Sequence, residues 1–225
     1  MDEVVAIDGP VGVGKSSVAA RLAARLGWRH LDTGAMYRAV ALLALRAGVA
    51  VEDEAACAEL ARAMSLDFLP DPAGQRVRLN GEDATDAIRS AEVTRAVSSV
   101  ADHPAVREEL GRRQRELGAA SPSVVEGRDM GTVVFPRARW KFYIDADPAE
   151  RARRRGDQLA AQGKPMDGDE LSRDVAERDR RDRLRPVGAL RVAEAAVIID
   201  TTGIDLDRVV EILECLVRGE MNSGR

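Results

Sequence analysis

The sequence has few cysteines and no long apolar run. Its 225 residues include only Cys57 and Cys215, each inside a helix-like stretch. Two such cysteines do not make a disulfide framework or a zinc site, so we expect buried free thiols in a reducing compartment. No apolar run approaches the length of a transmembrane helix, and the chain leads from Met-Asp-Glu straight into a short apolar strand. We therefore expect a cytoplasmic protein with no signal peptide and no membrane partner.

The sequence also lacks a surplus of either charge and has very little lysine. The net charge is −4, which gives no global attraction to nucleic acid, so no nucleic-acid partner is expected. Lysine supplies only three of the 34 basic residues (Lys15, Lys141 and Lys164), so the position of each lysine is informative. Arginine, the better bidentate ligand for phosphate, supplies the rest. The hydrophobic and charged fractions, 45% and 32%, are ordinary for a globular chain with one sizeable core.

Short apolar runs alternate with helical patterns along most of the chain. Strands are indicated at 4–7, 30–31, 124–125, 140–144 and 195–199. Helices are indicated at 16–26, 35–47, 53–64, 90–102, 104–118 and 206–217. This alternation predicts an α/β fold with a parallel sheet of five strands flanked by helices. Over 66–84 the period changes: Arg76-Val77-Arg78-Leu79 alternates polar and apolar residues, and Asn80-Gly81 is typical of a hairpin turn, which predicts a small antiparallel β insert.

The first predicted strand leads into a phosphate-binding motif. The pattern G-x-x-x-x-G-K-[ST] is met by Gly9-Pro10-Val11-Gly12-Val13-Gly14-Lys15-Ser16, with Ser17 next. Glycines let the backbone N–H groups of such a loop turn inward, and the following helix adds its N-terminal N–H groups. Lys15 is expected to reach the β- and γ-phosphates, and the Ser16 hydroxyl to ligate Mg²⁺. The loop therefore predicts binding of a nucleoside triphosphate.

The loop alone leaves open whether the protein is a kinase, a GTPase or another nucleotide-dependent switch. The segment Asp32-Thr33-Gly34-Ala35-Met36-Tyr37-Arg38 opens a helix directly after the second predicted strand. Loops at the carboxyl ends of parallel strands gather around one crevice, so Thr33, Tyr37 and Arg38 are candidates to face an acceptor. The alternative is an ordinary capped helix with a surface arginine.

A second polar segment, Glu126-Gly127-Arg128-Asp129, follows another predicted strand. Gly127 permits close approach, and Arg128 and Asp129 would point into the same crevice. An acid at the end of a strand, here Glu126, would be able to order Mg²⁺ through water. The alternative is a polar turn with no ligand.

Two arginine-rich helical stretches precede the last predicted strand. Arg178, Asp182 and Arg185 share one helix face, and so do Arg151 and Arg155. Arginines on a closing lid neutralise charge during phosphoryl transfer, although a charge run is more often a solvated, salt-bridged face. No strong general base is visible, which favours an acceptor that is already an anion, such as a phosphate, over an alcohol.

In these segments and several others, the chain resembles the bacterial-type cytidylate (CMP) kinases, and the resemblance covers essentially its whole length. The resemblance is carried by Ile7–Pro10 with Gly14–Ser17, Leu31–Arg38, Asn80–Asp83, Ser98–Arg107, Arg112–Arg115, Glu126–Pro136 and Glu177–Arg183. The run Gly-Arg-Asp-Met-Gly-Thr-Val-Val-Phe-Pro is the most specific of these. Val11 stands where the family often has a small residue, and Glu126 where some members have Asp.

The resemblance implies phosphorylation of CMP and dCMP with ATP and Mg²⁺ by a protein that is expected to be a monomer. It implies a core at 1–34, 119–148 and 192–225, an NMP-binding lobe at 35–118 with its β insert at about 66–84, and a helical lid at 149–191. Ser98, Arg107 and Asp129 would read the cytosine, and Arg178 and Asp182 would contact the sugar. Arg38, Arg128 and Arg185 would hold the acceptor phosphate, with Arg151, Arg154 and Arg155 as lid arginines near ATP.

Two kinds of alternative remain at this stage. One is a P-loop kinase for another small molecule, such as UMP, AMP or shikimate. Asp129 argues against UMP, because a carboxylate accepts a hydrogen bond from the exocyclic amine that cytosine has and uracil lacks. The other is a slow nucleotide-dependent switch with a protein partner, but no water-positioning residue or switch segment is identifiable in the sequence.

Overall fold

A computed structural model describes residues 3–71, 74–161, 163 and 166–223 of the chain. The chain divides into two compact units, one made of Met1–His30 with Gly118–Arg225 and the other of Leu31–Leu117. The two units are described separately below. In the part of the chain that the structure covers, no helix has both the length and the apolarity needed to cross a membrane.

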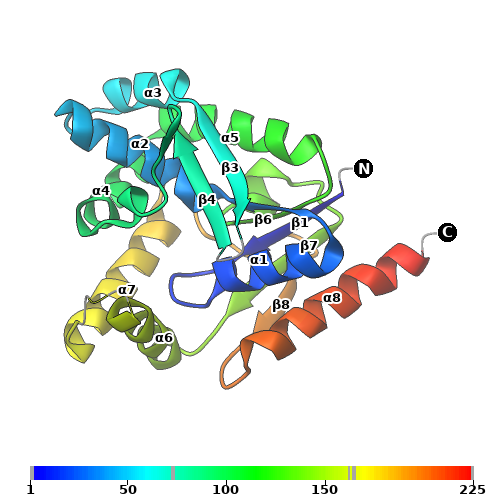
Figure 1. The fold of residues 1–225 in the computed structure, drawn as a ribbon. Coiled ribbons are helices and arrows are strands. Elements are labelled where there is room, and N and C mark those ends of the chain that lie inside the picture. Colours follow the sequence, from blue (N-terminus) through cyan, green and yellow to red (C-terminus); the bar gives the residue numbers. More distant parts are fainter. Residues whose placement is uncertain (1–2, 72–73, 162, 164–165, 224–225) are drawn as a thin grey trace. The chain divides into compact units, whose positions relative to one another are not determined.

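A five-stranded parallel sheet organises the first unit (Figure 1). The strands lie in the order β2-β6-β1-β7-β8, which confirms the predicted α/β fold and the five predicted strands. Their bounds are β1 Val4–Asp8, β2 Arg29–Asp32, β6 Ser123–Gly127, β7 Trp140–Asp145 and β8 Val197–Asp200, and the last two residues of β2 are counted in the second unit. All five residues of β1 are buried, as expected of a central strand covered on both faces.

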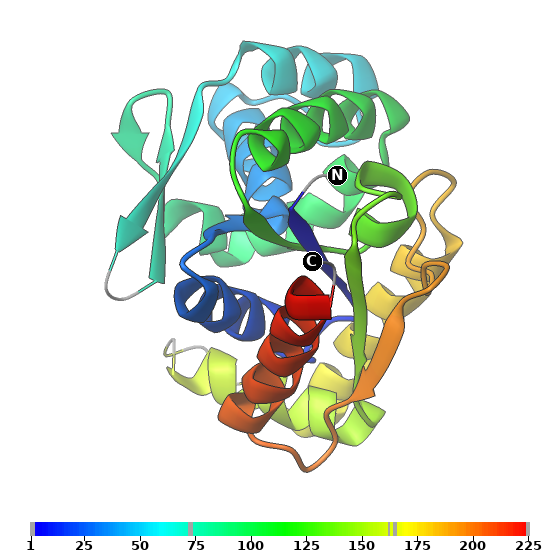
Figure 2. The same cartoon turned by 90° about the vertical axis from the view of Figure 1, so that its right-hand side faces the viewer.

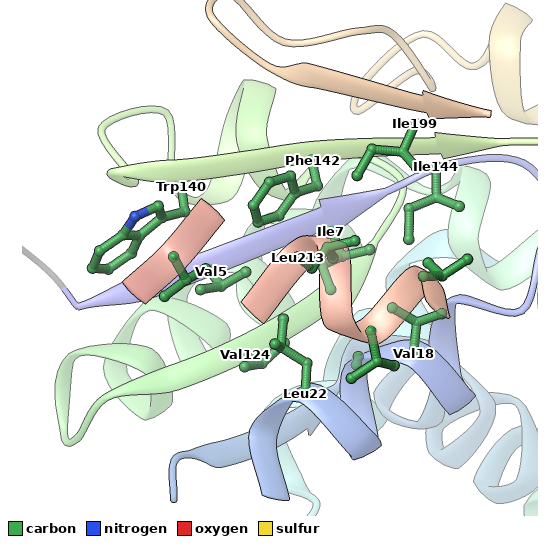
Figure 3. Packing of buried hydrophobic residues seen from close by; sticks show 14 of the residues in the cluster. Val5, Ile7, Val18, Leu22, Val124, Trp140, Phe142, Ile144, Ile199 and Leu213 are labelled. Carbon is green, nitrogen blue, oxygen red and sulfur yellow. The ribbon is translucent and has the colours of Figure 1, made fainter. Parts of the chain in front are cut away.

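Two helices of the first unit, α1 Lys15–Leu26 and α8 Leu206–Ser223, pack against this sheet and complete its core. The other two, α6 Pro148–Ala161 and α7 Gly168–Leu184, pack against each other. Figure 3 shows Val18 and Leu22 of α1 and Leu213 of α8 packed against the apolar side chains of the central strands. In Figure 2, α8 (red) and α1 (blue) lie beside each other, in agreement with their contacts. This core holds the end of β1, and hence the phosphate-binding loop, in a fixed place.

The second unit is built mainly from helices. Asp32 begins α2, because its side chain accepts a hydrogen bond from the N–H of Ala35. The helices α3 and α4 both pack against α2, and α4 also contacts the short η1. The elements are α2 Thr33–Ala47, α3 Glu54–Ala63, η1 Ala87–Arg89, α4 Ala91–Asp102 and α5 Pro104–Ala119, whose last two residues belong to the first unit.

The predicted β insert is present as a three-stranded antiparallel sheet. Its strands are β3 Leu66–Asp71, β4 Gly74–Leu79 and β5 Glu82–Asp83. Asn80 and Gly81 join β4 to β5 with positive φ angles of 50° and 86°, the conformation that a two-residue hairpin of this type requires. The side chain of Asn80 also accepts a hydrogen bond from the N–H of Ser65.

One expectation from the sequence needs correction. Both cysteines are free, but only Cys57 is buried and Cys215 is exposed. Cys215 lies on α8 between Leu213 and Val217, which face the core, so its own position on the helix points away from that face. The segment Met130–Val134, for which the sequence predicted no helix or strand, forms a short π-helix, η2.

Candidate functional site

The phosphate-binding loop runs from the end of β1 to the start of α1. Gly12 has a φ of 83°, and a Cβ there would lie 2.6 Å from the carbonyl oxygen of Arg151. A Cβ at Gly9 would lie 2.1 Å from the carbonyl oxygen of Ile144. Larger residues at these positions would therefore displace the loop. Among the described residues, no side chain caps the first turn of α1 and that turn contains no acid, so its N-terminus is suited to an anion.

Lys15 lies inside this loop and is 7% exposed. Its Nζ donates to the carbonyl oxygen of Pro10 at 2.6 Å. Burial, together with the nearby charge of Arg128, lowers the pKa of Lys15 to about 7, although Glu126 and Asp182 favour its charged form. The ammonium group is thus bound by a carbonyl oxygen of the loop itself. It lies in a site that favours the binding of an anion.

Ser16 and Glu126 meet at the end of β6. The Ser16 hydroxyl donates to Oε2 of Glu126 at 2.9 Å, while Oε1 of Glu126 lies 3.3 Å from Nε2 of His30. Burial alone would raise the pKa of Glu126, but His30, Lys15 and Ser16 together lower it. The sequence predicted Ser16 as a metal ligand and assigned no role to His30. The contact between His30 and Glu126 was missed because it joins two strands that are far apart in sequence.

Asp8, the last residue of β1, was also missed. It is 3% exposed, and its two oxygens accept hydrogen bonds from the N–H groups of Met130 and Gly131 at 2.9 and 2.8 Å. Burial raises the pKa of Asp8 to about 6 despite these hydrogen bonds. The only sequence signal was an acid at the end of an apolar strand, which is how Glu126 was singled out.

A group of charged residues joins the segment after β6 to the end of α7. Asp182 accepts a hydrogen bond from Nε of Arg128 at 2.6 Å and another from Nη2 of Arg185 at 2.7 Å. The helix ends at Leu184, so Arg185 follows its last residue yet still reaches Asp182. Burial and the positive charges of Arg128 and Arg155 lower the pKa of Arg178, which marks this region as able to take up an anion.

The predicted lid arginines Arg151 and Arg154 bind protein atoms in this structure. Arg151 is buried, forms an ion pair with Asp179 and donates to the carbonyl oxygen of Val11. Arg154 donates to the carbonyl oxygen of Thr201 at 2.6 Å and lies 3.4 Å from that of Val13. Both guanidinium groups therefore contact or approach the phosphate-binding loop from α6. Arg155 donates to Gln158 on the same helix.

The remaining predicted acceptor residues belong to the second unit. Arg38 of α2 donates to Thr94 at 2.9 Å and to the carbonyl oxygen of Ile88 at 3.3 Å. The guanidinium of Arg107 lies 5.3 Å from the centre of the Tyr37 ring and donates to the carbonyl oxygen of Ala101. Thr33 is buried at the start of α2, and Ser98 is half-buried on α4. The structure thus brings Tyr37 and Arg107 together within this unit.

Comparison with known proteins gives a consistent result. Residues 5–218 match the model of the family described as cytidylate kinase. A cytidylate kinase from Geobacillus kaustophilus is 49% identical over 207 residues, which is 92% of each chain. A cytidylate kinase from Anoxybacillus flavithermus is 46% identical over 214 residues, which is 95% of each chain. In fold alone, the chain is similar to the crystal structure of an uncharacterized protein from Eubacterium ventriosum, with a TM-score of 0.54, 11% identity and coverage of 97% and 99%.

Proposed function

The chain belongs to the cytidylate kinase family, and we propose that it transfers the γ-phosphoryl group of ATP to CMP and dCMP, forming CDP and dCDP. The observation that carries this proposal is the match to that family over residues 5–218, which includes every residue of the candidate site. The reaction makes the protein a nucleoside monophosphate kinase of pyrimidine metabolism.

The donor side of the site is the loop from Gly9 to Ser17. Its backbone N–H groups and the N-terminus of α1 would bind the phosphates, and Lys15 would leave the Pro10 carbonyl to contact them. The Ser16 hydroxyl and the Glu126 carboxylate offer oxygen atoms, the ligands that Mg²⁺ prefers, and lie 2.9 Å apart. No cluster of three potential metal-ligating acids, cysteines or histidines occurs among the described residues. This fits a metal held largely by the nucleotide, where Mg²⁺ would neutralise charge on the phosphates.

The acceptor side combines arginines with two carboxylates. Arg128, Arg185 and Arg38 are suited to the phosphate of CMP because guanidinium groups bind phosphate oxygens in pairs. Asp182 already orients Arg128 and Arg185, and with Arg178 it is the candidate contact for the sugar. Ser98, Arg107 and Asp129 are the candidates that read the cytosine, where Asp129 would accept a hydrogen bond from the exocyclic amine.

A phosphate acceptor explains the composition of this site. The attacking oxygen of CMP is already an anion, so the protein needs to align it with the γ-phosphorus and neutralise charge rather than remove a proton. Lys15 and the arginines of α6 and α7 serve that purpose. We propose that 149–191 acts as the lid and 35–118 as the NMP-binding lobe of a core formed by the rest of the chain.

A coupled assay of ATP turnover with a panel of acceptors tests the proposal. We expect CMP and dCMP to stimulate turnover well above UMP, AMP and shikimate. Faster turnover with UMP or AMP would replace the cytidylate assignment by another kinase. Turnover that no acceptor stimulates would favour a nucleotide-dependent switch.

Two further properties are proposed on the family's general pattern. We expect a monomer, which light scattering during gel filtration tests directly. We expect a cytoplasmic location because both substrates of the reaction are nucleotides that the cytoplasm supplies, and fractionation of cells that carry a tagged copy checks it.

A further inference from the structure

Asp8 connects the phosphate-binding loop to the segment that carries Arg128 and Asp129. It is the last residue of β1 and directly precedes Gly9, the first residue of the loop. Each of its two carboxylate oxygens accepts one hydrogen bond. One comes from the N–H of Met130 at 2.9 Å and the other from the N–H of Gly131 at 2.8 Å. These are the first two residues of η2 and follow Asp129 directly.

The strand register makes this contact possible. β1 and β6 run parallel, and Asp8 is paired with Gly127. The chain leaves the sheet after Gly127, passes through Arg128 and Asp129 and returns to Asp8 at Met130. The two candidate acceptor residues are therefore held in a short span between a backbone pairing and a carboxylate that accepts two hydrogen bonds.

Little space is left around the contact. A Cβ on Gly131 would lie 3.0 Å from the Cβ of Ala193 and 3.4 Å from Oδ2 of Asp8. Glycine at this position lets η2 approach the carboxylate closely. The contact thus depends on a charged acceptor at one side and on the absence of a side chain at the other.

Asp8 also lies within electrostatic range of both sides of the site. Lys15 favours its ionised form and Asp129 disfavours it. Burying a carboxylate costs free energy even when it is hydrogen-bonded, and an apolar residue would suit the end of a buried strand better if only packing mattered. The position of this group is therefore better explained by what it holds than by what it adds to the core.

We propose that Asp8 is a positioning residue for the acceptor, which fixes the Arg128–Asp129 segment relative to the phosphate-binding loop. It acts through the backbone of η2 and not by contact with the nucleotide. This inference rests on the proposed function, because it concerns how CMP is recognised by a kinase of this kind.

Asp8→Asn is the first test. Asparagine has the same shape, but its NH₂ group would face an N–H of η2, so one of the two hydrogen bonds is replaced by a donor–donor contact. We expect the KM for CMP to rise about tenfold or more, and the KM for ATP to change less than about threefold. Asp205→Asn is the matched control, since Asp205 is an exposed carboxylate that also accepts a backbone N–H, from Arg208.

Gly131→Ala tests the same contact from the opposite side. Its Cβ would push η2 away from Asp8 and Ala193, so we expect the same selective rise in the KM for CMP. Gly219→Ala is its control, because among the described residues no atom outside its chain neighbours and its own helix backbone lies within 4 Å of the position of that Cβ. If both changes act on one contact, the double variant will resemble the worse single variant, whereas independent effects would multiply.

Unfolding temperatures are measured for all variants, and CMP and ATP binding are measured by calorimetry as well as by turnover. A purely structural role predicts lower unfolding temperatures and a lower active fraction with both KM values unchanged, and that result would overturn the inference. An active wild-type kinase with an unaffected Asp8→Asn variant would also overturn it while leaving the proposed function intact. Wild-type protein that neither binds nor phosphorylates CMP would overturn both.

Discussion

Arg151 and Asp179 hold opposite sides of the same residue in the phosphate-binding loop. Arg151 of α6 donates to the carbonyl oxygen of Val11 at 3.2 Å, and Asp179 of α7 accepts from the N–H of Val11 at 3.2 Å. The two side chains also form an ion pair, and each is 6% exposed. The helices of the candidate lid are thereby attached to the loop through a buried pair of charges.

Asp179→Ala is expected to destabilise the protein and weaken ATP binding. It removes the carboxylate that pairs most closely with the buried guanidinium of Arg151 and, among the described residues, leaves only Asp145, 3.9 Å from Nε; loss of one partner of a buried pair costs about 3 kcal/mol. It also releases the N–H of Val11, so the KM for ATP should rise severalfold. Urea unfolding and initial rates at varied ATP measure the two effects.

Glu177→Ala provides the comparison on the same helix. Glu177 pairs with Arg180 at the exposed surface, where screening by solvent leaves such a pair little net effect on stability. This variant should retain both stability and the KM for ATP. If the two variants had the same stability and the same KM for ATP, the contact of Asp179 with Val11 would not contribute to either.

Lys15 is expected to take up a proton when ATP binds. In the free protein its pKa is about 7, lowered mainly by burial, so at pH 8 most of the protein carries a neutral lysine. The phosphates of ATP favour the charged form and raise that pKa. Titration calorimetry at pH 8 in two buffers with different ionisation enthalpies should therefore detect uptake of most of one proton. ATP itself is fully ionised at this pH.

Lys15→Arg is the control, because a guanidinium stays charged and has no proton to gain. Proton uptake per bound ATP should disappear in this variant whatever its affinity.

The same pKa of Lys15 has a consequence for stability. Between pH 7 and about 10 the unfolded chain binds more protons than the folded one at Lys15, so this residue makes stability rise with pH in that window. No buffer dependence in the wild type would contradict the low pKa.

Much of the fold and part of the site followed from the sequence, for identifiable reasons. Buried runs such as Val4–Ile7 and the Asn80-Gly81 turn are local patterns, so their elements could be predicted and the structure confirms them. The phosphate-binding loop is local too. Its residues are adjacent in the chain, and their spacing alone specifies the backbone path.

The contacts that were missed are all non-local. Asp8 with Met130, His30 with Glu126 and Arg151 with Val11 each join residues more than 90 positions apart. Such contacts depend on strand order, and the order β2-β6-β1-β7-β8 places β6 beside β1 although the whole second unit separates them in sequence. Residue spacing within a helix or a strand carries no information on that order.

Asp182 is expected to make stability sensitive to acid. Burial alone would raise its pKa, but Arg128 and Arg185 lower it to about 2. A carboxylate with a depressed pKa stabilises the folded state above its unfolded value of about 4, and this contribution is lost as the pH falls toward 2. The wild type should therefore be more stable than Asp182→Asn by about 2 kcal/mol at pH 6, with a difference that shrinks below pH 4. Urea unfolding across this range measures it, and a difference independent of pH would refute the assignment.

Asp129→Asn is expected to reduce discrimination between CMP and UMP. Asp129 is buried directly before η2, and its carbonyl oxygen accepts from the N–H groups of Val133 and Val134, so its backbone is fixed independently of its side chain. The carboxylate accepts only, which matches the amine of cytosine and opposes the carbonyl of uracil. An amide presents both a donor and an acceptor, so phosphorylation of UMP should become more efficient and phosphorylation of CMP less efficient. We expect the ratio of kcat/KM for CMP over UMP to fall about tenfold or more, with a modest change in the KM for ATP. Asp205→Asn again serves as the matched control, and an unchanged ratio in Asp129→Asn would remove Asp129 from base recognition.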